Sequence, residues 1–152
     1  MIAGMGPRTF RMAVVLLLAA PATALCAAAD CLRLERGWAR ATPTMPMAAG
    51  YGVLRNQCPY PVAVVSVRSP DFGEVSLHRT VQEDGVSRMR AVERLPLSAG
   101  EQVVLQPGGL HLMLMQARDE LPEGKRLRLS FVLEDGRQAP AELRVARSAP
   151  QP

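Results

Sequence analysis

The stretch LQPGGLHLMLMQ, residues 105–116, decides how the chain folds. A turn signal, Pro107-Gly108-Gly109, is followed by strict alternation between leucine and other residues. Alternate side chains of a β-strand point to the same face. The alternation therefore predicts a core stripe of Leu110, Leu112 and Leu114, with His111, Met113 and Met115 on the opposite face. We expect His111 and Met113, next to the turn, to be accessible, and Met115, further along, to pack.

The same kind of pattern recurs along the chain. Its 152 residues include 13 prolines and 12 glycines, and turn residues bound each short apolar segment. No segment keeps a helical period over about ten residues. Short strands at regular spacing are typical of a β-sandwich or barrel, so we expect a single all-β domain. Besides 111–116, the expected strands are CLRLERGWAR (31–40), GYGVLR (50–55), VAVVSVR (62–68), EVSLHRTV (74–81), VSRMRAV (86–92), EQVVLQ (101–106), RLRLSFVLE (126–134) and AELRVA (141–146).

The N-terminal segment has the features of a secretory signal. Arg8 and Arg11 precede the apolar run MAVVLLLAA (12–20), and Ala27-Ala28-Ala29 fits a cleavage site. The run is too short to span a membrane. We therefore expect residues 1–29 to be removed on export to the periplasm of a Gram-negative bacterium, leaving a domain at 30–146 without a membrane span. The tail at 147–152 is expected to be disordered.

Charge and cysteine content narrow the classes of function. Loss of two signal arginines leaves 16 basic against 14 acidic residues, a net charge of about +2, without a basic patch for nucleic acid. Cys26 leaves with the signal. Cys31 and Cys58 remain, and neither follows a lipobox, which disfavours a lipid anchor. In an oxidising compartment we expect them to form a disulfide worth about 3 kcal/mol; the alternative is a role as metal thiolates.

The segment QEDGVS (82–87) predicts a tight hairpin. Asp84-Gly85 suits a two-residue turn in which both central residues have positive φ. The resulting register pairs Thr80 with Met89 and His78 with Ala91. His78, Thr80 and Met89 then share a face, which brings an imidazole and a thioether to about 7 Å of each other at the backbone.

The combination of histidine and methionine suggests a soft-metal site. Thioether sulfur suits Cu(I), and imidazole also accepts copper. A single methionine on a strand is usually core filler, and a single histidine near a turn is usually a satisfied polar residue. Here both histidines of the chain, His78 and His111, lie on expected strands with a methionine on the same face. From the residues alone, a metal site and ordinary packing remain equally open.

The order His78, Met89, His111, Met113 follows the pattern H-x10-M-x21-H-x-M. In this pattern the chain resembles the periplasmic copper chaperone family of the PCu(A)C type, and the resemblance extends over nearly all of the exported part. The segments that carry it are WARATPTMPMAAGYGVLRN (38–56), EDGVSRMR (83–90), LPLSAGE (95–101), LQPGGLHLMLM (105–115) and LPEGKRLRLSFVLEDG (121–136).

The resemblance implies a cupredoxin-like Greek-key β-barrel that holds one Cu(I) per chain at an exposed site. It implies that His78, Met89, His111 and Met113 are the ligands. It also implies a carrier rather than an enzyme, which delivers copper for cytochrome oxidase assembly by ligand exchange. The partners would be copper-donating or copper-accepting periplasmic proteins, namely thioredoxin-like copper proteins and oxidase subunits. We expect the carrier to be a monomer.

Some features depart from the family or leave alternatives open. Many relatives have Met directly after the first histidine, where this chain has Arg79, and the tail lacks the His and Met residues of some relatives. Met45 and Met47, on a proline-rich loop, are possible auxiliary ligands, or simply loop packing. Two other functions remain: a metal-free assembly module, and a copper electron-transfer protein, although no cysteine lies near either histidine in sequence.

Overall fold

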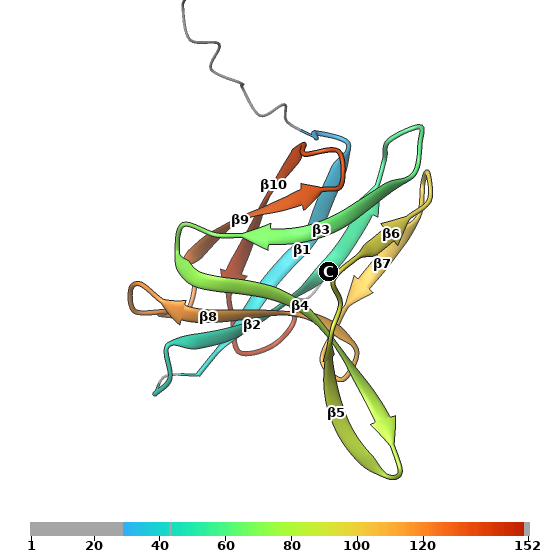
Figure 1. The fold of residues 1–152 in the computed structure, drawn as a ribbon. Helices are drawn as coiled ribbons and strands as arrows, with labels where there is room; N and C mark the ends of the chain where they lie inside the picture. The colour runs from blue at the N-terminus through green and yellow to red at the C-terminus, as the bar shows by residue number, and fades with distance from the viewer. Residues whose placement is uncertain (1–28, 43, 151–152) are drawn as a thin grey trace, which may run out of the picture.

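The structure is a computed structural model that describes residues 29–42 and 44–150, and this part of the chain is built from β-strands alone (Figure 1). All nine expected strands are present, and the all-β prediction is confirmed. Within these ranges there is no helix that could span a membrane. The strands are β1 (Leu32–Ala41), β2 (Met47–Asn56), β3 (Val62–Arg68), β4 (Phe72–Glu83), β5 (Val86–Ala91), β6 (Leu95–Leu97), β7 (Gln102–Leu105), β8 (Leu110–Ala117), β9 (Arg126–Leu133) and β10 (Gln138–Val145).

The strands form one sheet that curls around a core. Its order is β5-β4-β8-β2-β1-β10-β9-β3-β6, and β7 pairs with β2. The β1–β10 pairing is parallel and the other pairings are antiparallel. β4 and β8 are neighbours although about 30 residues of chain separate them. This crossover brings the two histidine-bearing strands side by side.

The leucine stripe of β8 lies in the core, as its alternation predicts. Leu110, Leu112 and Leu114 are 5%, 0% and 0% exposed. They pack with the large buried side chains of the other strands, which include Phe72, Phe131, Leu54 and Leu143. Burial of the leucine face by the sheet leaves the alternate residues of β8 on its outer side.

The Cys31–Cys58 disulfide is present, with the two Cα atoms 4.9 Å apart. Cys58 follows Asn56, a fully buried residue whose side chain satisfies several backbone groups. Its Nδ2 donates to the carbonyl oxygens of Tyr60, Leu97 and Ser98, and its Oδ1 accepts from the Cys58 amide. The bridge therefore fixes β1 to the end of β2, and the asparagine fixes that end to β6.

The two ends of the chain are only partly described. The expected signal peptide lies outside the described residues, with Cys26, except for Ala29. Ala29 is 1% exposed, and its amide donates to the Gln138 carbonyl over 2.8 Å. In the expected tail, Arg147 lies 3.2 Å from Glu123. Ala149 and Pro150 line a surface hollow together with Trp38.

Candidate metal centre

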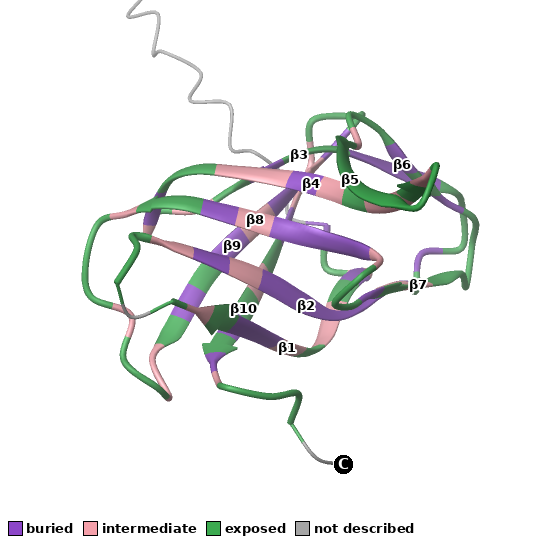
Figure 2. Cartoon of the chain, turned by 90° about the horizontal axis from the view of Figure 1, so that it is seen from below, coloured by how far each residue is buried: buried purple, intermediate pink, exposed green. Residues whose placement is uncertain are grey.

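The β4–β5 hairpin has the predicted register. Thr80 pairs with Met89 and His78 with Ala91. Asp84 and Gly85 both have positive φ, 52° and 76°, as a two-residue hairpin turn of this type needs. The hairpin projects from the body of the barrel (Figure 1), and β5 is exposed along its whole length (Figure 2). Met89 is consequently 59% exposed.

The two histidines lie directly opposite each other on neighbouring strands. His78 of β4 pairs with His111 of β8, and their ring centroids are 6.2 Å apart. Two pairs further along, beyond Leu77 and Leu112, Met113 opposes Ser76. Directly opposed residues, and residues two apart on one strand, share a face of the sheet. The four residues of the sequence motif therefore project from the same outer face, and three of them come from two alternate pairs of β4 and β8.

His111 is held in a defined orientation by the turn before it. Its Nδ1 lies 2.9 Å from the Gly109 carbonyl oxygen. Because a carbonyl oxygen only accepts, Nδ1 must carry the proton, and the lone pair of the neutral ring is on Nε2. A backbone partner of this kind orients metal-binding histidines. The expectation that His111 is accessible is wrong: the turn and the sheet leave it only 6% exposed. The site therefore has a buried side at His111 and an exposed side at Met89.

His78 has one ring nitrogen without a partner. Its Nε2 lies 3.0 Å from the Ser76 hydroxyl oxygen. Its Nδ1 is buried and has no hydrogen-bond partner among the described residues. Buried polar atoms are nearly always satisfied, so an exception calls for a physical reason. A neutral ring that donates from Nε2 to Ser76 leaves a bare lone pair on Nδ1, which a cation would satisfy.

The chemistry of this face is that of neutral, soft ligands. A bond between a metal ion and an imidazole nitrogen is about 2 Å long, taking zinc as a guide. Two such bonds to one ion, one from each ring, span about 4 Å of the distance between the two ring centroids. Thioethers favour Cu(I) over harder ions. Within 29–42 and 44–150, no group of three or more His, Cys, Asp or Glu residues gathers as a metal site. The histidines have methionines, not carboxylates or thiolates, as their neighbours in the motif.

Of the other described methionines, Met47 and Met115 lie further along the same face. Met47 opposes Met115, which is four residues along β8 from His111. The expectation that Met115 packs is wrong: it is 37% exposed, because the outer face of β8 is uncovered at this end. Met45 is 49% exposed and lines a hollow between its own loop and residues 117–122. Met47 is the first residue of β2 and not a loop residue as expected, and neither it nor Met45 lies beside the histidine pair.

Two residues that sequence reasoning overlooked support the histidines. Ser76 contacts His78, and Gly109 accepts from His111. Each precedes its histidine by two positions, which on a strand puts Ser76 on the same face as His78. That spacing was a usable signal for Ser76. The contact of the Gly109 carbonyl with His111 depends on the geometry of the turn, so the alternation of residues along the strand does not predict it.

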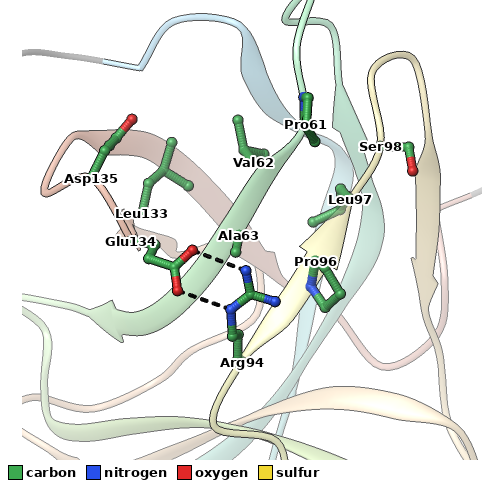
Figure 3. A pocket seen from close by; sticks show the side chains of 10 residues that line it. All are labelled: Pro61, Val62, Ala63, Arg94, Pro96, Leu97, Ser98, Leu133, Glu134 and Asp135. Atoms are coloured by element: carbon green, nitrogen blue, oxygen red, sulfur yellow. Dashed lines mark hydrogen bonds and ion pairs between the residues drawn. The ribbon is translucent and has the colours of Figure 1, made fainter.

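Another hollow, between β3, β6 and the β9–β10 turn, offers different chemistry (Figure 3). Its polar feature is the paired contact of Arg94 with Glu134, at 3.0 and 2.9 Å. The Arg94 guanidinium lowers the pKa of the Glu134 carboxyl below its ordinary value by hydrogen bonding and charge attraction. The lining contains no histidine, methionine or cysteine. The two charges satisfy each other, so we assign no soft-metal site here.

Fold and site together define an all-β, cupredoxin-like domain with a histidine–methionine outer face. The chain belongs to the LpqE-like family: the family model, described as putative lipoprotein LpqE-like, matches residues 32–145. A putative lipoprotein of Leifsonia xyli subsp. xyli is 29% identical over 120 residues, which are 77% of this chain and 70% of that protein. An uncharacterized protein of Rickettsia prowazekii is 28% identical over 118 residues, 74% of this chain and 65% of its own length.

Solved structures show the same fold. The apo PCuAC domain from PmoF1 has a TM-score of 0.62 at 21% identity, covering 78% of this chain and 95% of that one. The copper-bound PCuAC domain from PmoF2 has a TM-score of 0.62 at 22% identity, covering 78% and 94%. The solution structure of CuI-DR1885 from Deinococcus radiodurans has a TM-score of 0.59 at 25% identity, covering 79% and 83%. The resemblance to PCuAC domains is confirmed at the level of the fold.

Proposed function

We propose that this protein is an exported Cu(I) chaperone that carries one ion at His78, Met89, His111 and Met113. The observation that carries the proposal is the direct opposition of His78 and His111, with both methionines on the same outer face. The bare Nδ1 of His78 supports it. Copper-bound forms among the similar PCuAC structures support it further. The description of the family as putative lipoproteins supports export, with the periplasm as the compartment.

The exposure of the ligands suggests how the ion is passed on. Met89 stands on an edge hairpin and is 59% exposed, whereas His111 is 6% exposed. A partner's ligand therefore reaches the copper from the Met89 side. A thioether is a weak ligand, so Met89 leaves first and His111 last. The step exchanges ligands only and involves no change of oxidation state. We propose copper proteins of cytochrome oxidase assembly as the recipients.

The alternative of electron transfer finds less support. Blue-copper sites use a cysteine thiolate with two histidines. The two described cysteines are joined in a disulfide, remote from both histidines in sequence. A shell rich in thioether also disfavours Cu(II), which a redox carrier must reach.

A competition titration tests the proposal. Cu(I) is partitioned between the protein and a chromogenic Cu(I) chelator, with wild type, Met113→Leu, and Met115→Leu as the matched control on the same face of β8. We expect one tight equivalent in wild type and in the control, and an affinity at least about tenfold lower in Met113→Leu. Absence of binding in wild type would support a metal-free assembly module, and a blue band with reversible redox cycling would support electron transfer.

A further inference from the structure

The outer face of β2, β8 and β4 is organised in rows of opposed residues. One row contains His111 and His78. Two residues further along β8, Met113 is flanked by Ala49 and Ser76. After two more residues, Met115 is flanked by Met47 on β2 and Glu74 on β4. Opposed residues in an antiparallel pair have Cβ atoms about 5 Å apart. Met47 and Met115 are therefore a cross-strand thioether pair on the same face as the histidines.

The methionine pair is too far from the histidines to share one ion with them. Successive residues on a strand advance about 3.3 Å, so Met115 is about 13 Å from His111 along β8. Met113 lies midway, about 7 Å from each. An ion bound by Met47 and Met115 is thus a second ion. Of the four ligands proposed for the first ion, Met113 is the one that lies on β8 between His111 and Met115.

The pair is available for binding in a way that core methionines are not. Methionine normally fills gaps in apolar cores. Here Met115 is 37% exposed, and Met47 is only partly buried. Backbone contacts hold their strands in place: the Ala117 amide donates to the Pro46 carbonyl over 2.9 Å, next to the pair. The scaffold is therefore fixed while the sulfur-bearing ends remain accessible.

The charge beside the pair favours a cation. Glu74 completes the row, is exposed, and makes no ion pair with any described residue. The nearest arginine on β1, Arg40, opposes Ala49 in the next row and stacks on Trp38 and Tyr51 instead. A monovalent ion at the sulfurs is thus next to an uncompensated carboxylate.

We propose that Met47 and Met115, with Glu74 beside them, form a second and weaker site for a monovalent soft ion, Cu(I) or its surrogate Ag(I). An ion at this pair moves by exchange of thioethers through Met113 to the histidine row. This transfer role rests on the proposed chaperone function, whereas binding at the pair does not. The Met47–Met115 pair is thus the end of this transfer path that lies farthest from the histidines, on the same face of the sheet.

The test follows the methyl signals of methionine by NMR during titration with Ag(I), which does not change oxidation state. In wild type we expect the first equivalent to shift Met89 and Met113, and the second to shift Met47 and Met115. In the double variant Met47→Leu/Met115→Leu the second step disappears, while the first keeps its affinity within about twofold. Glu74→Gln weakens the second step about threefold; Glu93→Gln, an exposed acid elsewhere, leaves it unchanged.

The outcomes separate this inference from the proposed function. Methyl signals of Met47 and Met115 that stay fixed through two equivalents overturn the second site. The same signals moving together with Met89 and Met113 in the first equivalent also overturn it, because all four would then serve one ion. Loss of the first step with survival of the second contradicts the chaperone site alone. In the variant His78→Ala/His111→Ala we expect the Met47 and Met115 shifts to persist.

Discussion

His78 and His111 face each other across the β4–β8 pair, with ring centroids 6.2 Å apart, although 32 residues separate them in sequence. In sequence, β5, β6 and β7 all come between β4 and β8, yet the pairing register makes the two rings neighbours. Each ring also has a second contact on its own strand or turn, Ser76 or Gly109. The geometry of the pair is thus set by backbone register and refined by two hydrogen bonds.

Removal of the serine hydroxyl is expected to weaken copper binding without loss of a ligand. Ser76→Ala frees the His78 ring, whose Nε2 is now 3.0 Å from that hydroxyl. Loss of such an orienting partner typically costs about tenfold or more in metal affinity. Competition titration measures the change. Thr80→Val, on the other side of His78 on the same strand face, is the control and keeps wild-type affinity. Equal affinities for Ser76→Ala and wild type would show that the hydroxyl does not orient the ring.

Gly85→Ala is expected to disturb the hairpin that carries Met89. Gly85 has a φ of 76°, and an added Cβ meets no atom within 4 Å, so the cost is conformational, about 1 kcal/mol. Gly136→Ala is the matched control: its φ is 86°, its surroundings are equally open, and it lies in the β9–β10 turn. Denaturant unfolding should show similar losses of stability for both variants, whereas only Gly85→Ala lowers Cu(I) affinity. A similar effect of both on affinity would speak against a ligand on this hairpin.

The disulfide is expected to support stability and not metal binding. Cys31→Ser/Cys58→Ser removes a cross-link over a sequence separation of 27 residues, worth about 3 kcal/mol of unfolding free energy. Because the bridge lies at the β1–β2 end and not on the histidine face, Cu(I) affinity of the folded variant should remain within about twofold of wild type. Urea unfolding and chelator competition check the two parts separately. A large loss of affinity in a folded double variant would revive the thiolate alternative.

Local signals in the sequence predicted much of the site. Asp84-Gly85 specified the turn, and the turn fixed the Thr80–Met89 register, because a two-residue loop allows one pairing register between the two strands of the hairpin. Alternation assigned Leu112 to the core and His111 to the other face. The short strand β6 was not expected, since three residues around Pro96 carry almost no pattern.

Features that depend on pairing between distant strands could not be read from the sequence. Alternation gives the face of Met115 but not its neighbours, and the antiparallel pairing with β2 puts Met47 opposite it. The burial of His111 likewise depends on how the sheet and the preceding turn enclose it. The same limitation explains why the sequence could only suggest Met47 as an auxiliary ligand, whereas the register places it opposite Met115, four residues along β8 from His111.

X-ray absorption of the protein loaded with one equivalent of Cu(I) tests the ligand set most directly. We predict two nitrogen neighbours at about 2.0 Å and two sulfur neighbours at about 2.3 Å, taking the distances known for zinc as a guide. In Met113→Leu one sulfur should be lost from the shell while both nitrogens remain. A wild-type shell without sulfur, or one without nitrogen, would contradict joint binding by His78, His111, Met89 and Met113.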